Sequence, residues 1–397
     1  MTSHAAFDYQ PRTRLVYGVG TVDRVGELAA ELGGKRILLV TDGGIAKAGH
    51  AQRVLENLSK HADTVTLFDK VHENPTTKDV NDCLAVARAA NINLIVGLGG
   101  GSSMDTAKGT NFLLTNGGEM KDYWGVGKAT KPMLPLIAIP TTAGTGSECQ
   151  CAALIADEET HNKMACLDPK AAAKVAILDP ALTVSMPQRV TAFTGIDAIA
   201  HAVETAVSKK RNPLSLMYSY AAFRLLVPSL PRVLSHPDDV EARGRMLLGA
   251  AYAGTAIENS MLGAAHSAAN PLTAHFNIVH GQAVGMMLPQ VVRFNSEDPE
   301  ALQGYAELAS SAEIAKLKDG ATSALEGLIA RLDSLLNIAK MPRTLGECGV
   351  SADDLPVMAD EAVKQWTVNF NPRPMTAADF RELYERAFDR RSDGDLV

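Results

Sequence analysis

The sequence predicts an α/β domain with a parallel sheet, followed by an all-helical domain. Apolar, β-branched runs alternate with helical stretches through the first half of the chain. After about Pro187 these strand signals almost disappear, and long stretches rich in alanine and leucine show helical spacing. A chain of 397 residues is also too long for one ordinary hydrophobic core. We therefore expect one domain over residues 1–186 and a second over residues 187–397.

The elements of both domains are predicted from their apolar patterning. Strands that alternate with helices, as in the first half, are parallel and joined by crossover helices. The strand-like runs are 35–42, 63–70, 94–99 and 135–142, and the helical stretches between them are 49–62 and 76–91. In the second half, helical spacing runs through 189–208, 213–234 and 241–270.

Composition argues against several classes of partner. A net charge of −7 is unfavourable for binding nucleic acid. No apolar run approaches the roughly 20 residues of a membrane span, and the N-terminal residues lack the apolar stretch of a secretory signal. Five scattered cysteines, an odd number, favour reduced thiols. We expect a cytoplasmic protein without a nucleic-acid or membrane partner.

A glycine-rich turn is the first candidate binding feature. GLGGGSSMDTAKG (97–109) follows a predicted strand and opens a helix, so its backbone amides can approach a phosphate closely. A second polar turn, PTTAGTGSE (140–148), follows another strand, and ligands of open α/β sheets bind beyond such strand ends. The alternative is a tight turn that binds nothing. Ser102 stands where the GxGxxG dinucleotide fingerprint needs its last glycine.

A carboxylate and an imidazole lie four residues apart in an apolar stretch, GIDAIAHAVET (195–205). On a helix, Asp197 and His201 share one face. The pair alone fits a buried hydrogen bond, a helix N-terminal device or two arms of a metal site. The rest of the chain must decide among the three.

Further histidines follow in GAAHSAANPLTAHFNIVHGQAVG (263–285). His266 and His280 can share one metal only if the chain turns between them, and we expect Pro271 to break the helix there, after Asn270. With Asp197 and His201 they would make one carboxylate and three imidazoles. Such a set suits a divalent first-row metal with one position left open.

Six segments, in their order and spacing, resemble the iron-containing (group III) alcohol dehydrogenase family. They are GGGSSMDTAK (99–108), IPTTAGTGSE (139–148), KVAILDPALT (174–183), TGIDAIAHAVE (194–204), HSAANPLTAHFNIVHG (266–281) and NPRPMT (371–376). The resemblance covers almost the whole chain. It implies a dehydroquinate synthase-like fold, with an α/β nucleotide-binding domain followed by an all-α metal-binding domain.

The resemblance also implies residue roles. The family's metal ligands correspond to Asp197, His201, His266 and His280. Its cofactor contacts correspond to Asp42, Asn74, Gly100, Gly101, Ser102, Asp105, Thr141, Thr142, Thr145, Ser147 and Lys163. Asp42 is predicted to accept a hydrogen bond from the ribose 2′-hydroxyl of NAD and to repel the phosphate of NADP. The alternative is a turn aspartate before Gly43.

One position departs from the family. Many members carry a second histidine four residues after the third metal ligand, and this chain has Asn270 there. We predict that His275, or a water held by Asn270, relays the substrate proton instead.

The resemblance implies an NAD-dependent, metal-dependent dehydrogenase that interconverts a small primary alcohol or diol and its aldehyde. The metal is expected to be Fe²⁺, with Zn²⁺ or another divalent ion as alternatives, and the enzyme to be a homodimer or larger homo-oligomer. A zinc-type polyol (glycerol-like) dehydrogenase and a hydroxyacid–oxoacid transhydrogenase are alternative functions. A metal-stabilised binding protein with a dead site is the alternative from another class.

Overall fold

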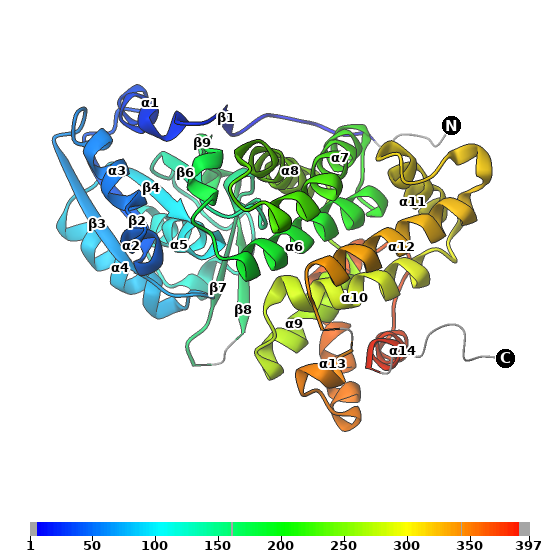
Figure 1. The fold of residues 1–397 in the computed structure, drawn as a ribbon. Coiled ribbons are helices and arrows are strands. Elements are labelled where there is room, and N and C mark those ends of the chain that lie inside the picture. The colour runs from blue at the N-terminus through cyan, green and yellow to red at the C-terminus, as the bar shows by residue number, and fades with distance from the viewer. Residues whose placement is uncertain (1–5, 160–161, 343, 389–397) are drawn as a thin grey trace. The chain divides into compact units, whose positions relative to one another are not determined.

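The computed structural model describes residues 6–159, 162–342 and 344–388. Its contacts divide the chain into two compact units. One unit is Tyr9–Met186, and the other is Pro187–Val397 together with Met1–Asp8. The first unit is built on a sheet, whereas the second is helical (Figure 1).

A six-stranded parallel sheet forms the centre of the first unit, in the order β1-β9-β6-β4-β2-β3. Its strands are β1 (Arg14–Tyr17), β2 (Arg36–Asp42), β3 (Thr64–Val71), β4 (Leu94–Gly99), β6 (Leu136–Pro140) and β9 (Val175–Leu178). The four strands predicted from the sequence correspond to β2, β3, β4 and β6. Parallel sheets bury both faces, which explains why these strands read as continuous apolar runs.

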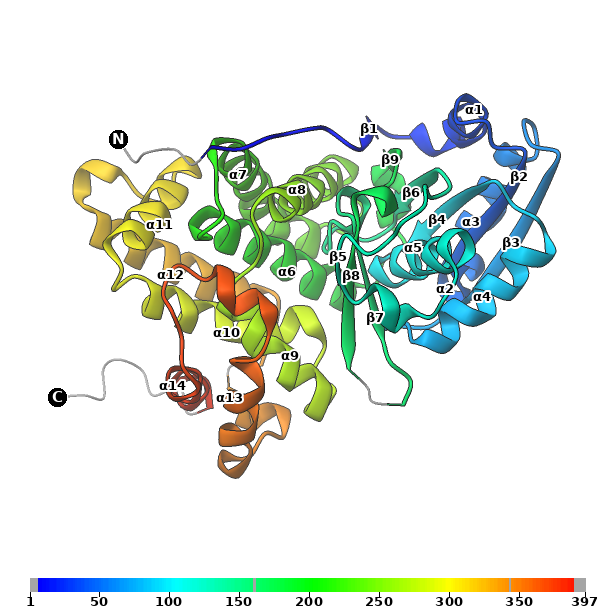
Figure 2. The same cartoon turned by 180° about the vertical axis from the view of Figure 1, so that it is seen from behind.

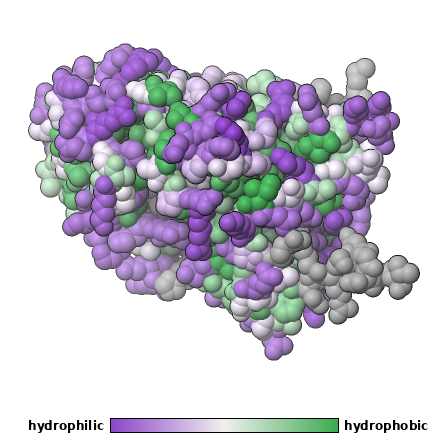
Figure 3. All heavy atoms as spheres, in the orientation of Figure 1, coloured by the Kyte–Doolittle hydropathy of each residue, from purple (hydrophilic) through white to green (hydrophobic). Residues whose placement is uncertain are grey.

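Helices cover both faces of this sheet. They are α1 (Val25–Glu31), α2 (Gly43–Lys47), α3 (His50–Leu58), α4 (Thr77–Ala89) and α5 (Gly101–Asn116). Alternate residues of β2 serve the two faces, since Ile37 packs in the cluster with α1 and α3, and Leu38 in the cluster with α4 and α5. The outward side chains of α1 and α3 are hydrophilic (Figure 3). A small sheet of β5 (Gly125–Val126), β8 (Lys163–Leu167) and β7 (Ala152–Ala156) completes the unit (Figure 2).

The second unit consists of packed helices, and its described residues after Pro187 include no strand. The helices are α6 (Gln188–Val207), α7 (Pro213–Ser235), α8 (Val240–Asn259), α9 (Ala264–Phe276), α10 (His280–Asn295), α11 (Pro299–Ser311), α12 (Ala321–Ile338), α13 (Leu355–Ala362) and α14 (Ala377–Phe388). Nearly all of α6 is buried, as expected for a helix that is apolar all round. No described helix has the length and apolar composition needed to cross a membrane.

The predicted helix break at Pro271 is wrong. Helix α9 runs through Pro271 to Phe276, and the chain turns only at Asn277, which caps the helix in the left-handed conformation with φ 53°. A proline inside a helix forfeits one hydrogen bond, and the buried face of α9, which includes Leu272, offsets this cost. Consequently His266 lies in the first turn of α9, and Asn270 lies within the helix rather than at its end.

Candidate metal centre and cofactor site

The glycine-rich turn joins β4 to α5 and leaves the first amides of α5 without side-chain caps. Gly99 has φ 142°, and a Cβ there would lie 2.5 Å from Ser103 Oγ, so only glycine fits. A Cβ on Gly101 would lie 2.9 Å from Thr145 Cγ2. The second polar turn therefore packs directly on the first. The two turns form one backbone cradle at the N-terminus of a 16-residue helix, where an anion is favoured.

Asp42 lies beside this cradle because β2 and β4 are neighbouring parallel strands. Its Oδ1 caps α2 by accepting hydrogen bonds from the backbone N–H of Gly44 (2.8 Å) and Ile45 (3.0 Å). Its Oδ2 lies 3.3 Å from the position of a Cβ on Gly99 and accepts no hydrogen bond from the described residues. Oδ1 therefore has the structural role expected of a turn aspartate, whereas Oδ2 faces the glycine-rich turn.

Asp105, on α5, is hydrogen-bonded directly to Ser147, on the second polar turn, and a buried lysine that the sequence interpretation overlooked also binds Ser147. Ser147 Oγ donates to Asp105 Oδ1 at 3.2 Å. Lys108, on α5, has no exposed surface and donates to Ser147 O (2.7 Å) and Ala152 O (2.9 Å). Lys163, on β8, adds a second favourable charge near Asp105. These bonds fix the second turn against α5.

The other predicted cofactor residues lie at the same strand ends. Asn74 donates its backbone N–H to Ser102 Oγ at 3.3 Å. A Cβ on Gly100 would lie 3.4 Å from Thr142 Cγ2. Thr141 is 2% exposed, and its hydroxyl has no hydrogen-bond partner among the described residues. The structure therefore brings the predicted cofactor residues of the first unit together.

Two acids of this region have perturbed pKa values. Burial raises the pKa of Asp105 to about 6, although Lys108 and Lys163 oppose the shift. Burial also raises the pKa of Glu148 to about 7, opposed by its backbone hydrogen bond and by Lys108. The Oε1 atom of Glu148 is buried and has no hydrogen-bond partner among the described residues. Glu148 is therefore a buried acid whose protonation changes near neutral pH.

In the second unit, Asp197, His201 and His266 form a buried cluster that offers one oxygen and two nitrogens within 4.8 Å of one another. Asp197 Oδ1 lies 3.5 Å from His201 Nε2 and 3.4 Å from His266 Nε2. Ligand atoms about 2.1 Å from a tetrahedral metal are about 3.4 Å apart, so these distances fit a metal site. Asp197 Oδ1 and His266 Nε2 are also buried without a hydrogen-bond partner among the described residues.

His280, the first residue of α10, lies beside this cluster. Its Nε2 is 4.0 Å from Asp197 Oδ1, and its ring centroid is 5.4 Å from that of His266. Gly281 makes the approach possible, because a Cβ there would lie 2.2 Å from Phe193 O. The side chain of His280 is 30% exposed, whereas those of His201 and His266 are 5% exposed. The cluster is therefore most accessible on the His280 side.

A second carboxylate, Glu204, supports the cluster and was missed in the sequence. It lies on α6, one turn after His201, and its Oε2 is 2.5 Å from His266 Nδ1. Its Oε1 accepts the backbone N–H of Ala265 at 2.7 Å. Because this carboxylate accepts a hydrogen bond from Nδ1–H, the neutral form of His266 is unprotonated at Nε2, and that lone pair can bind a metal. The available signal in the sequence was a charged residue within an otherwise apolar helical stretch, and in the structure Glu204 is 4% exposed.

The electrostatics of the cluster are dominated by these buried charges. Burial raises the pKa of Asp197, but His201, His266 and His280 more than offset this effect, and its pKa is well below the usual range. Burial lowers the pKa of His266, but Glu204 and Asp197 more than offset it and raise that pKa to about 9. The site thus favours positive charge among its carboxylates.

Comparison with known proteins identifies the family. A family model described as iron-containing alcohol dehydrogenase matches residues 11–180, and the model of the C-terminal part of that family matches residues 191–388. The chain belongs to the iron-containing alcohol dehydrogenase family. The resemblance stated from the sequence is confirmed, and NAD and iron are the cofactors of this family.

Relatives match along almost their whole length. The 1,3-propanediol dehydrogenase of Klebsiella pneumoniae is 34% identical over 389 residues, covering 97% of this chain and 100% of that protein. The NAD-dependent methanol dehydrogenase of Bacillus methanolicus is 33% identical over 373 residues, covering 94% and 97%. The structure of an alcohol dehydrogenase from Oenococcus oeni superposes with a TM-score of 0.92 at 30% identity, covering 96% and 100%. This iron-type alcohol dehydrogenase is therefore an oxidoreductase, and its predicted dehydroquinate synthase-like fold class is confirmed.

The two predicted relay residues of this dehydrogenase have other partners. Asn270, one turn after His266, donates through Nδ2 to Gln365 Oε1 at 2.9 Å. His275 Nε2 is 2.8 Å from Glu361 Oε2 in a partly exposed pair. His275 follows His266 by nine positions, which is about 13 Å along the axis of α9. His275 therefore shares no described contact with the cluster.

The late NPRPMT segment contributes an anchor rather than a ligand. Asn371 Oδ1 accepts the backbone N–H of Ala264 at 3.3 Å and lies 3.0 Å from Asn295 Nδ2. A Cβ on Gly263 would lie 3.0 Å from the same oxygen. The segment thus fixes the first turn of α9, which carries His266. The sequence showed this motif but not its role.

Proposed function

We propose that this iron-type dehydrogenase interconverts a small primary alcohol or diol and its aldehyde, with NAD as hydride carrier and a divalent metal at the substrate oxygen. The observation that supports it is the buried Asp197, His201 and His266 cluster, with ligand atoms at metal-site spacing and His280 beside it. Two of the relatives are named as dehydrogenases of methanol and of 1,3-propanediol, which supports a small hydroxyl substrate.

NAD would be held by the unit Tyr9–Met186, which we propose as the cofactor domain. The amides at the start of α5 would bind the pyrophosphate, and Gly100 and Gly101 would keep the backbone accessible. Asp42 Oδ2 would accept a hydrogen bond from the ribose 2′-hydroxyl. The remaining contacts are proposed for Asn74, Ser102, Asp105, Thr141, Thr142, Thr145, Ser147 and Lys163.

The metal would be held by Asp197, His201, His266 and His280 in the unit Pro187–Val397, which we propose as the metal domain. The orphaned Asp197 Oδ1 and His266 Nε2 support the fit. A bound divalent ion supplies Lewis acidity, which makes the substrate hydroxyl more acidic and polarises the aldehyde carbonyl. Fe²⁺ is the proposed ion, and Zn²⁺ binds such ligands at least as well.

The proposed ligands keep their donor atoms aimed inward through contacts of the chain itself. Glu204 holds the proton on Nδ1 of His266, and burial of Asp197 and His201 excludes water from the closed side of the cluster. Of the two relay hypotheses, a water held by Asn270 is the better supported, because Asn270 is one helical turn from His266 and His275 is far along the helix.

We also propose a cytoplasmic homo-oligomer. Strand β1 lies at the edge of the sheet and exposes Leu15 and Tyr17, with Val19 following. An exposed apolar edge strand is a ready site for pairing with a second copy. No disulfide joins any of the described cysteines, which agrees with a reducing compartment.

The proposed function is tested by following reduced nicotinamide in the presence of NAD⁺, Fe²⁺ and a panel of primary alcohols, diols, glycerol and hydroxyacids. We expect turnover with small primary alcohols or diols. His266→Ala and His280→Ala should each lose both turnover and bound metal. Nucleotide binding should survive in both variants. Full metal occupancy in either variant would refute the ligand assignment, and turnover only with glycerol or with hydroxyacid–oxoacid pairs would favour the alternative functions.

A further inference from the structure

Met261 has a backbone conformation that residues other than glycine rarely adopt. Its φ is 120°, whereas the other described non-glycine residues with positive φ all lie between 47° and 59°, in the ordinary left-handed region. A non-glycine residue held at such a φ weakens the folding equilibrium by roughly fivefold to a hundredfold, and it persists only where the surrounding structure enforces it. Met261 lies in the linker between α8, which ends at Asn259, and α9, which carries His266. The contacts on the two sides of this linker therefore account for the strain.

On the α8 side, the linker begins from a fixed point. Ser260, directly after the helix, is 4% exposed, and its hydroxyl donates to Ala256 O at 2.7 Å. The carbonyl of Asn259 accepts a hydrogen bond from Asn212 Nδ2 at 2.8 Å, which ties the end of α8 to the start of α7. Only two residues remain between Ser260 and Gly263, the N-cap of α9.

On the α9 side, two side-chain oxygens from distant parts of the chain hold the first turn. Asn371 Oδ1 accepts a hydrogen bond from the backbone N–H of Ala264 at 3.3 Å. Glu204 Oε1 accepts one from the backbone N–H of Ala265 at 2.7 Å. Both oxygens also crowd Gly263, because a Cβ there would lie 3.0 Å from the first and 3.3 Å from the second. Since Gly263 has no side chain to cap α9, these two oxygens take the place of a local N-cap.

The amide of Asn371 can face α9 in only one orientation. Asn371 is 1% exposed, and its Nδ2 donates to Asn295 Oδ1 at 2.7 Å and to Arg373 O at 2.8 Å. Its Oδ1 accepts from Asn295 Nδ2 at 3.0 Å as well as from Ala264. Both donors and both acceptor positions are thus used. The reverse orientation would place an NH₂ group against two other donors, so the oxygen is fixed toward the first turn.

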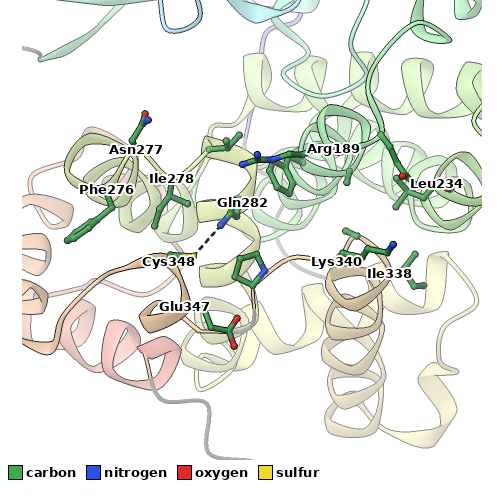
Figure 4. Close-up of a pocket in the computed structure, with 16 residues that line it drawn as sticks. Arg189, Leu234, Phe276, Asn277, Ile278, Gln282, Ile338, Lys340, Glu347 and Cys348 are labelled. Carbon is green, nitrogen blue, oxygen red and sulfur yellow. Dashed lines mark hydrogen bonds between the residues drawn. The ribbon is translucent and has the colours of Figure 1, made fainter.

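The other end of α9 is more open. Residues 264–269 are all buried, whereas His275 and Asn277 are exposed. Figure 4 shows Phe276 and Asn277 beside an open groove of about 510 Å³, which the turn after α9 lines. The position of His266 therefore depends on the contacts of the first turn.

We propose that Asn371 is a positioning residue for His266 and that Met261 carries the resulting strain. Asn371 and Glu204 together hold the start of α9 where the short linker can follow only by placing Met261 at a φ of 120°. His266 Nε2 is thereby held 3.4 Å from Asp197 Oδ1 before a metal binds. A ligand already in place loses less conformational freedom on binding, which strengthens the metal site. This inference rests on the proposed metal site.

A double-mutant cycle in the metal-free protein tests whether Asn371 enforces the strain. Met261→Gly removes the strain but also frees the unfolded chain and deletes side-chain contacts, so its effect alone does not isolate the strain. We expect Met261→Gly to favour folding about tenfold more in the wild type than in Asn371→Ala, because release of the first turn lets Met261 relax. Urea unfolding of the four proteins measures this. Effects that combine independently, within about twofold, would overturn the inference.

Metal affinity tests the positioning of His266. Asn371→Ala should weaken Co²⁺ binding about tenfold and change the absorption spectrum of bound Co²⁺, since a displaced imidazole alters the ligand geometry. The matched control is Asn111→Ala, in the unit Tyr9–Met186. Asn111 is likewise 1% exposed, and its amide bonds the backbone of Leu134 at 2.8 and 3.1 Å. The control should lose stability and keep the Co²⁺ affinity and spectrum of the wild type.

Gly263→Ala is an independent second variant, because its Cβ displaces the same two oxygens without removing a side chain. It should weaken Co²⁺ binding as Asn371→Ala does, and it replaces that variant in both experiments if Asn371→Ala does not fold. Wild-type Co²⁺ affinity in a folded variant at either position, or an equal loss in Asn111→Ala, would refute the positioning role. A wild type that binds no Co²⁺ would refute the proposed metal site and the positioning role with it, whereas the unfolding cycle would still decide whether Asn371 enforces the strain.

Discussion

Glu204→Gln tests whether a buried carboxylate sets the metal-binding form of His266. In the wild type Glu204 accepts two hydrogen bonds, at 2.5 Å from His266 Nδ1 and at 2.7 Å from the backbone N–H of Ala265. Glutamine keeps the shape but offers one acceptor and one donor. If its oxygen serves Ala265, its NH₂ meets Nδ1 and favours the tautomer with the proton on Nε2. That tautomer cannot bind a metal through Nε2.

The expected loss of metal affinity follows from the two orientations that the glutamine side chain can adopt. In the other arrangement the NH₂ group faces the Ala265 N–H and leaves a buried donor unsatisfied, at a cost of about 1–3 kcal/mol. Either arrangement weakens the metal site by about tenfold to a hundredfold, the range typical of lost carboxylate–histidine support. Chelator competition measures this affinity, and the absorption spectrum of the Co²⁺-loaded protein reports ligand geometry independently of turnover.

Glu361→Gln is the matched control. It alters the same kind of carboxylate–imidazole pair, Glu361 with His275 at 2.8 Å, but both side chains are about 40% exposed. Exposed pairs contribute little, so metal affinity and the Co²⁺ spectrum should match the wild type. The reasoning is refuted if Glu204→Gln retains wild-type metal affinity, or if the control loses as much. Unfolding of the metal-free proteins separates general destabilisation from loss of the site.

Glycine packing, a buried acid and the strand-end aspartate give three further tests. Gly281→Ala should shift α10 and weaken metal retention roughly tenfold, whereas Gly327→Ala, with only 3.6 Å contacts, should leave it unchanged. Burial raises the pKa of Glu148 from 4.5 to about 7, so the wild type loses stability as pH rises through that range. Glu148→Gln should therefore gain about 1–3 kcal/mol over wild type between pH 4.5 and 8 in urea unfolding, and parallel pH curves would contradict this. Asp42→Gly should raise kcat/KM with NADP⁺ relative to NAD⁺ about tenfold, and equal use of both by the wild type would show that Asp42 does not contact the ribose.

The fold was largely predictable because its signals are local. Strands buried on both faces read as apolar runs, and the helical unit reads as continuous helical spacing. The break at Pro271 failed because tertiary packing decided it: α9 keeps its buried face through the proline, and Asn277 makes the turn. Proline marks where a helix is costly, whereas the surrounding contacts determine whether the chain accepts that cost.

The site residues were predictable where their spacing along one helix brings them together. Asp197 and His201 are neighbours through helical spacing alone, so sequence suffices for them. Glu204 belongs to the same helix, but its partner His266 is 62 residues away, and no local pattern connects them. Lys108 and Asn371 were missed for the same reason, since each acts on backbone that only the fold brings near.

Glu204 also changes the charge balance of the proposed metal site. With Asp197 as its one anionic ligand, a divalent site carries a net charge of about +1. Glu204 is 4% exposed and Asp197 is 5% exposed, and no described lysine or arginine contacts either carboxylate. Two buried negative charges are costly without compensation, and a divalent cation between them brings the sum to zero. In the metal-free protein the raised pKa of His266 offsets part of this charge, and in the proposed metal-bound site the two acids favour a divalent ion over a monovalent one.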